Sequence, residues 1–97
     1  MQYDDLLVYL GENGKSFKTL GQRSQFEARG ENGILVIKNS AMSEYKIIEE
    51  IYLKVLNRFN SLPLNEKRLS KKYNLPNWPE CPATIQSPYI PAILVCV

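Results

Sequence analysis

The chain contains no histidine, and this absence limits the catalysis that it could support. Histidine is the usual general base, the usual partner of serine and cysteine nucleophiles, and a common metal ligand. The two cysteines, Cys81 and Cys96, have no second pair with which to complete a tetrahedral zinc site. Neither a GxxxxGK[ST] nor a GxGxxG phosphate-binding loop occurs. We therefore expect no metal ion, no cofactor and no enzymatic activity.

One pattern has a catalytic shape, namely Glu44-Tyr45-Lys46. Metal-dependent nucleases place a metal-binding carboxylate and a lysine two residues apart on one strand face, and they need a further acid upstream. The nearest aspartates here are Asp4 and Asp5, and Glu44 is expected in the first turn of a helix, where the helix dipole favours a carboxylate. A helix start is therefore the preferred interpretation, and a nuclease is not predicted.

Basic residues in the second half of the chain are the most suggestive feature. Four cations are expected on the outer side of one short helix, where they could contact successive phosphates of a nucleic acid: Lys67, Arg68, Lys71 and Lys72. A solvated lysine-rich face that serves solubility is the alternative. Lys38, Asn39 and Ser40 at a strand end could add contacts to a nucleic acid, although turn formation explains the asparagine and serine as well.

Two aromatic residues are candidates for binding a protein partner. Trp78 lies between prolines and could present a flat recognition surface, or it could cover one end of the core. An exposed apolar patch around Trp78 and Tyr89 would favour a protein partner.

The elements that must position these side chains begin with an apolar block at residues 3–10. It is too short for its periodicity to separate a strand from a helical turn. Asn13-Gly14 and Asn32-Gly33 predict tight turns, because this dipeptide supports positive φ angles. Three segments predict antiparallel strands, the last of them central: Ser16–Leu20, Ser24–Arg29 and Ile34–Ile37.

A long amphipathic helix is predicted from about residue 44 to residue 60, with Ser43 as its cap. Its buried row should pack on the central strand, and it consists of Ile47, Ile51, Val55 and Phe59. Pro63 should end the helix, because the residue before a proline avoids helical torsions.

Two shorter helices are predicted after it. The first is capped by Asn65 and runs through Tyr73, with Leu69 and Tyr73 on its inner side. Leu75–Pro82 should be extended, because its prolines cannot donate backbone hydrogen bonds. Ser87-Pro88 predicts the start of a buried helix that ends at Val97, with a terminal strand as the alternative for this apolar run.

Composition predicts one globular domain over residues 1–97, of which 44% are apolar and 23% charged. The longest apolar run, Ala92 to Val97, is far shorter than the roughly 18 residues that span a bilayer. With an acidic N-terminus and two cysteines expected as free thiols, the cytoplasm is the expected compartment. Residues 1–50 carry six basic and eight acidic side chains, whereas residues 51–97 carry six and two. A basic half points towards an anionic partner.

The order of elements resembles the small α+β modules that accompany restriction and other DNA-processing proteins. The segments that carry the resemblance are the strand with Asn39-Ser40, then Tyr45-Lys46-Ile47, Ile51–Leu56, the basic helix and Ser87–Leu94. Those modules often have a glycine-containing hairpin where this chain has Ala41-Met42, and a plain connection where it has Trp78 among prolines. The resemblance implies an accessory role at DNA.

The predicted fold is α+β, with a small antiparallel sheet of three or four strands covered by one long and two short helices. The predicted function is a non-catalytic nucleic-acid-binding or accessory module that uses the basic helix. A protein-interaction domain is the alternative, either a homodimer or the small partner of a regulatory protein. A surface shared by the basic helix and by residues 38–40 would favour nucleic acid.

Overall fold

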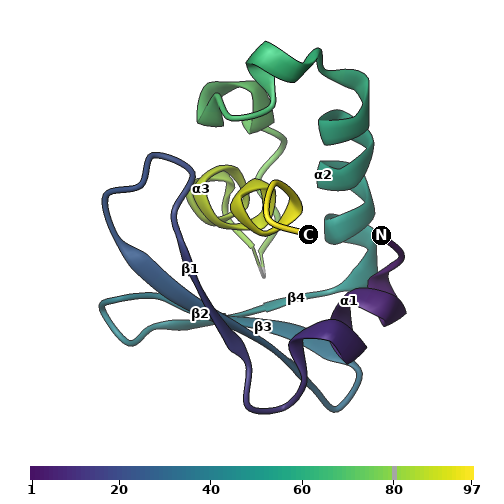
Figure 1. The fold of residues 1–97 in the computed structure, drawn as a ribbon, viewed down its shortest axis with the longest axis vertical. Helices are drawn as coiled ribbons and strands as arrows, with labels where there is room; N and C mark the ends of the chain where they lie inside the picture. The colour runs from purple at the N-terminus through teal and green to yellow at the C-terminus, as the bar shows by residue number, and fades with distance from the viewer. Residues whose placement is uncertain (80) are drawn as a thin grey trace.

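The computed structural model describes residues 1–79 and 81–97, and it has the predicted α+β fold (Figure 1). Its elements are α1 (Tyr3–Leu10), β1 (Lys15–Lys18), β2 (Gln25–Glu31), β3 (Ile34–Lys38), β4 (Glu44–Ile47), α2 (Glu49–Ser61), the 3₁₀ turns η1 (Leu64–Glu66) and η2 (Ser70–Tyr73), and α3 (Ala83–Leu94). Within the described ranges, no helix is long and apolar enough to cross a membrane.

The four strands form one antiparallel sheet in the order β1-β2-β3-β4. Asn32 and Gly33 have φ angles of 53° and 77°, and they close the tight turn between β2 and β3 as predicted. Gly14 also has a positive φ of 78°, but the turn before it joins α1 to β1 rather than two strands.

One face of the sheet is apolar and carries the helices (Figure 1). Strand residues on this face alternate with exposed polar residues, as expected for a sheet with one wet face. On the opposite face the Arg29 guanidinium reaches across β3 to Glu44 on β4, at 3.2 Å, and also pairs with Glu31 at 3.0 Å. The Arg29 side chain lies over Val36, its paired residue on β3. Val36 is therefore only 2% exposed, although it is on the sheet face that carries no helix.

The long helix begins at Glu49, so the predicted start at residue 44 is wrong. Residues 44–47 pair with β3, and Ile48 has extended torsions (φ −73°, ψ 160°) before the helix starts. Hydrogen bonds to β3 stabilise residues 44–47 as a strand. This tertiary contact could not be predicted from apolar residues spaced four apart. Ile51 and Val55 are buried as predicted, Ile47 is buried as a strand residue, and Phe59 is half-buried.

The predicted basic helix is replaced by the two 3₁₀ turns, and the extended Leu69 separates them. Nucleating a helix is unfavourable, and a segment this short forms too few helical hydrogen bonds to offset that free energy. Instead, the Tyr73 hydroxyl donates to the Lys67 carbonyl at 2.6 Å, and the Tyr73 side chain is buried. Leu69, expected on the inner side, is 40% exposed.

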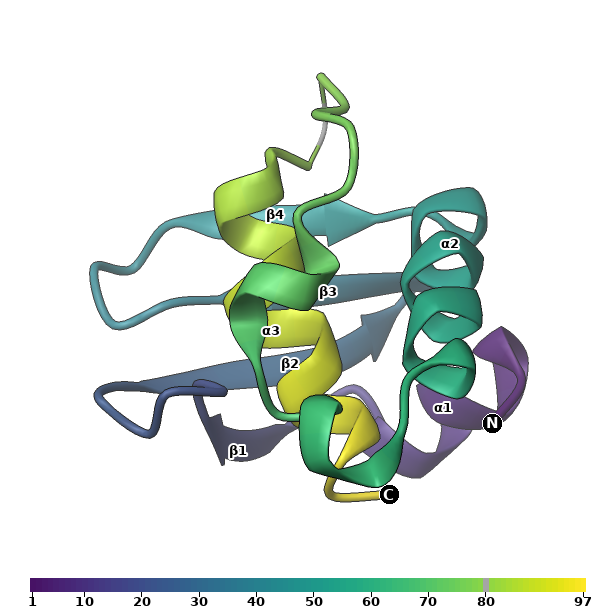
Figure 2. The same ribbon diagram turned by 90° about the horizontal axis from the view of Figure 1, so that it is seen from above.

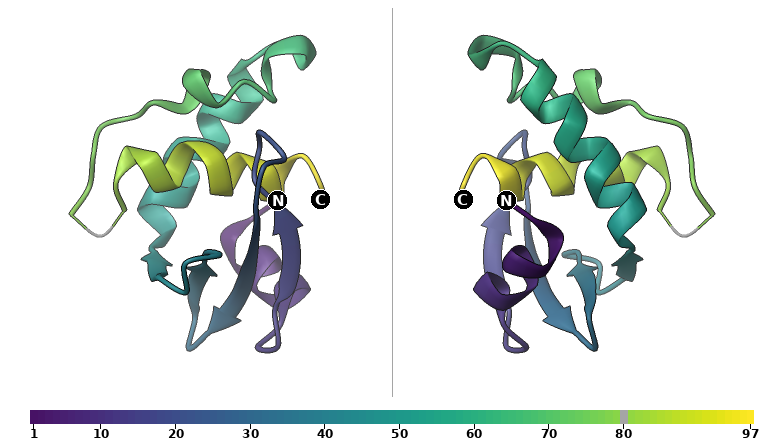
Figure 3. Two further views of the ribbon diagram at one scale, coloured as in Figure 1. Left: turned by 90° about the vertical axis from the view of Figure 1, so that its left-hand side faces the viewer. Right: turned by 90° about the vertical axis from the view of Figure 1, so that its right-hand side faces the viewer.

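The last element is a helix, which decides between the two predicted alternatives, but it starts at Ala83 instead of Ser87. Pro82 precedes it, and the Asn77 side chain accepts a hydrogen bond from the Ala83 N–H at 2.5 Å. Pro88 and Pro91 lie inside the helix, where each removes one backbone hydrogen bond. The helix persists because most of its second half is buried between the sheet and α2. The axes of α2 and α3 cross at a steep angle (Figure 3).

The N-terminal block is also a helix, α1, whose buried residues Tyr3, Leu6 and Leu10 recur with helical spacing. It packs on β2 at Gly30, where a Cβ atom would lie 2.7 Å from the Leu7 carbonyl oxygen. The sheet therefore carries three helices on its apolar face.

Candidate functional site

The four cations of residues 67–72 do not form one row. The Lys67 ammonium donates to the Phe59 carbonyl at 2.5 Å and lies 4.3 Å from the centre of the Phe59 ring. Lys72 forms an ion pair with Glu66, with 2.6 Å between Nζ and Oε1. Lys67 thus attaches residues 64–73 to α2, and Lys72 joins the two 3₁₀ turns to each other. Arg68 and Lys71 are exposed.

Lys38, Asn39 and Ser40 lie at the hairpin between β3 and β4, away from residues 64–73 at the top of Figure 1. The Asn39 side-chain oxygen accepts hydrogen bonds from the N–H groups of Ala41 and Ser43, both at 3.0 Å. Turn formation therefore accounts for the asparagine. The structure does not place these residues on one surface with the cations of residues 67–72.

Tyr89 packs edge-on against Phe26, with 4.9 Å between the ring centres and 73° between the planes. It is half-buried between α3 and the sheet, and it lines a hollow with Arg23 and Ser24, whereas Trp78 lines one with Lys54 and Arg58.

Trp78 belongs to the extended segment that joins η2 to α3 (Figure 2), which we call the strap, residues 74–82 without the undescribed residue 80. Trp78 and Cys81 exchange backbone hydrogen bonds of 3.3 and 3.0 Å. The fully buried Gln86 amide donates to the carbonyls of Cys81 at 2.7 Å and Pro76 at 3.3 Å. These bonds fix the strap on both sides of Trp78, at Pro76 and at Cys81, and so they position the indole.

A groove of about 400 Å³ lies between the strap and α2, and we call it the Trp78 groove. Its lining consists of Lys54, Asn57, Arg58, Ser61, Leu75, Pro76 and Trp78. An indole, two cations and two neutral polar side chains meet there, and none of these seven residues, which belong to the described part of the chain, is acidic. Lys54 and Arg58 are not among the candidate site residues that the sequence singled out. Their spacing of four residues, which puts them on one helix face, was the available signal.

No protein family, curated protein or solved structure matches this chain. The geometry of the Trp78 groove and of the remaining surface therefore carries the functional argument.

Glu44 and Lys46 lie on β4, two residues apart on its exposed face, and not on a helix. The prediction that Glu44 starts a helix is therefore wrong. Glu44 pairs with Arg29, whereas Asp4 and Asp5 belong to α1. Among the described residues, no group of three or more His, Cys, Asp or Glu side chains could hold a metal ion.

The two cysteines occupy different surroundings. Cys81 belongs to the strap and its side chain is buried, whereas Cys96 carries an exposed free thiol near the C-terminus. No disulfide joins them.

Proposed function

We propose that this protein is a non-catalytic nucleic-acid-binding module, and that it binds a single-stranded segment in the Trp78 groove. One observation carries the proposal: the groove joins a half-buried indole to the cations Lys54 and Arg58, and none of its described lining residues is acidic. Aromatic side chains beside a cationic track are the usual means of binding single strands without reading their sequence.

In this proposal a base stacks on Trp78, and the adjoining phosphates approach Lys54 and Arg58 on α2. Stacking of one base on an aromatic side chain contributes about 1–3 kcal/mol, and each phosphate contact adds a salt-dependent term. Gln86 and the prolines of the strap support a preformed site, because they reduce the freedom that binding would otherwise have to remove.

The charge distribution also supports an anionic ligand. Residues 51–97 carry six basic and two acidic side chains, and this half includes the strap and α2 from Ile51 onward, after its two N-terminal acids Glu49 and Glu50. Two of the cations first proposed as phosphate contacts, Lys67 and Lys72, have partners within the protein. The proposal therefore moves the contact surface from residues 67–72 to α2. A cytoplasmic location is proposed with it, because the exposed Cys96 thiol suits a reducing compartment.

The test is binding of a labelled oligothymidylate over a range of salt concentrations. Replacing Lys54 and Arg58 together by alanine should lower the slope of log affinity against log salt by about 1.4, because each single-strand phosphate contact contributes about 0.7. The matched control removes two cations from the sheet, with Lys15→Ala and Lys46→Ala, and it should leave the slope unchanged. The Lys71→Ala and Lys72→Ala pair tests the original basic-segment hypothesis in the same assay.

Trp78 provides an independent signal, because it is the only tryptophan in the chain. Stacking of a base should quench its fluorescence with the same midpoint as the binding curve. Absence of binding by both single-stranded and duplex DNA at low salt would refute the proposal, as would binding that leaves the indole fluorescence unchanged.

A further inference from the structure

The outer edge of β1 has backbone groups that the sheet does not use. In an antiparallel pair, alternate residues direct their N–H and C=O groups towards the partner strand. The Thr19 N–H donates to the Ser24 carbonyl at 2.9 Å, so Phe17 and Lys15 belong to the bonded set. Ser16 and Lys18 therefore direct their N–H and C=O groups away from β2, towards the open side.

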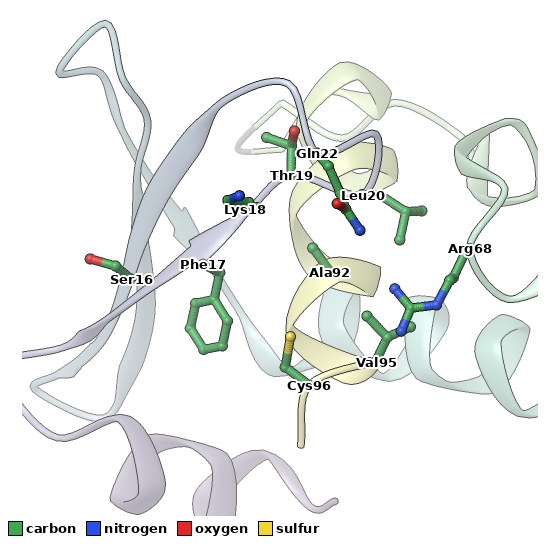
Figure 4. Close-up of a pocket in the computed structure, with 10 residues that line it drawn as sticks. All are labelled: Ser16, Phe17, Lys18, Thr19, Leu20, Gln22, Arg68, Ala92, Val95 and Cys96. Carbon is green, nitrogen blue, oxygen red and sulfur yellow. The ribbon is translucent and has the colours of Figure 1, made fainter.

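Beyond this edge lies a groove of about 300 Å³, which we call the edge groove (Figure 4). The run of residues from Ser16 to Leu20 lines one side, and Ala92, Val95 and Cys96 from the end of α3 line the other. The Leu20 N–H donates to the Pro88 carbonyl at 2.9 Å, and this bond closes one end of the free edge. A strand that paired with β1 would thus lie directly beside α3.

The polar groups of the edge groove are cationic or neutral. Figure 4 shows the Arg68 guanidinium directed towards the C-terminal end of α3 beside Val95, and the Gln22 amide directed towards α3 from the loop that follows β1. Arg68 is exposed and has no ion-pair partner among the described residues. Among the described residues, ten line the groove, and none of these ten carries a carboxylate.

Apolar surface continues from the edge groove across the C-terminal end of α3. Arg68 and Val95 also line a neighbouring hollow of about 330 Å³, together with Leu64 and Val97. Leu64 is 85% exposed and Val97 is 42% exposed. Exposed apolar groups beside unpaired cations suit a partner with apolar and acidic side chains.

We propose that the free edge of β1 is a second binding site, where an extended acidic segment of a partner protein adds as a strand. Its backbone would pair with Ser16 and Lys18. One alternate set of its side chains would face Val95 and Arg68, and the other would lie beside Lys18 on the exposed face of the sheet. A second copy of this chain fits less well, because its own β1, Lys15–Lys18, would bring two further lysines and no acidic side chain to this cationic edge.

The probe is a labelled eight-residue peptide with blocked ends that alternates valine and glutamate, followed by fluorescence anisotropy. Ser16→Pro removes an outward N–H without breaking the β1–β2 ladder, and it should weaken binding at least about tenfold. Ser16→Ala is the matched control and should bind like the unaltered protein. Arg68→Ala should weaken the valine–glutamate peptide, and a valine–lysine peptide should bind at least about tenfold more weakly.

The mode of binding is tested on the unaltered protein, which removes any doubt about folding of the proline variant. A series of peptides, each N-methylated at one position, should lose affinity only when the methyl group is at every second position, because only alternate N–H groups of an added strand face β1. Uniform tolerance of N-methylation, or equal binding of the lysine peptide, would overturn the proposal. A dimer in sedimentation experiments that Ser16→Pro dissociates would also overturn it, since a second copy would then occupy the edge.

Discussion

A single hydroxyl group joins α1 to two strands of the sheet. The Tyr3 O–H donates to the Ile47 carbonyl and accepts a hydrogen bond from the Leu35 N–H at 2.9 Å. Leu35 and Ile47 are directly paired residues of β3 and β4. Burial raises the pKa of Tyr3 above its ordinary value of 10.0; the hydrogen bond from Leu35 opposes this rise, and the carboxylates of Glu49 and Asp4 add smaller increases.

This burial predicts a loss of stability at alkaline pH. Burial also raises the pKa of Tyr52 and of Tyr73 above 10.0, so the unfolded chain releases these three protons at lower pH than the folded protein does. The folded state is therefore stabilised by keeping these three phenols protonated. This contribution to the free energy of unfolding is complete below about pH 10, and it should be lost as the pH rises through the pKa values of the folded protein. Urea unfolding at a series of pH values measures it.

Tyr3→Phe should make that alkaline decline shallower, because one of the three buried phenols no longer titrates. Tyr9→Phe is the control, since Tyr9 is 44% exposed and the change should leave the decline as it was. An equal decline in the Tyr3 variant would show that other groups cause it.

At the scale of elements, the contact of α1 with β2 depends on a glycine whose torsions are ordinary. Gly30 does not have a positive φ, but a Cβ atom there would lie 2.7 Å from the Leu7 carbonyl oxygen and 3.0 Å from the Leu7 Cβ. The Gly30 N–H also donates to the Gly11 carbonyl at 3.0 Å. Close approach of two backbones therefore requires glycine at this position.

Gly30→Ala should lower the free energy of unfolding by about 1–3 kcal/mol, because the added methyl group must displace α1 from the sheet. Gly21→Ala is the matched control. No atom lies within 4 Å of its added Cβ, so we expect no loss and a slight gain from the stiffer unfolded chain. Denaturant unfolding of both variants measures the difference, and equal stabilities would show that α1 moves aside at no cost.

The elements also show where sequence patterns are ambiguous. The turn at Asn32-Gly33 and the strand at Ile34 to Ile37 could be predicted, because their torsional and β-branched signals are local. The row of apolar residues four apart, from Ile47 to Phe59, obscured a change from strand to helix at Ile48. A residue every fourth position has the same phase in a strand as on a helix face, so spacing alone could not locate the boundary.

At the scale of the whole molecule, α2 and α3 join the sheet in one core. Ile51, Tyr52 and Val55 of α2 are fully buried, as are Leu35 and Ile37 of β3. Ile51→Ala should cost about 2–5 kcal/mol of unfolding free energy, because it leaves a cavity inside this core. Exposed Leu53 provides the control, since Leu53→Ala should cost far less. A loss below about 0.5 kcal/mol for the Ile51 variant in a urea melt would contradict this description of the core.

The α+β class, the antiparallel strands and the buried face of the long helix follow from composition, turn residues and periodicity, which act over a few neighbouring positions. The candidate sites do not follow from such signals. The Trp78 groove exists because Gln86 ties the strap to α3 and leaves it beside α2, and the edge groove exists because α3 ends beside the free edge of β1. Residues 67–72 show the same limit: their charges are evident in the sequence, but contacts with Phe59 and Glu66 decide which of them remain available to a partner. Such contacts join residues distant in the chain, and their energies depend on tertiary packing that local patterns do not encode.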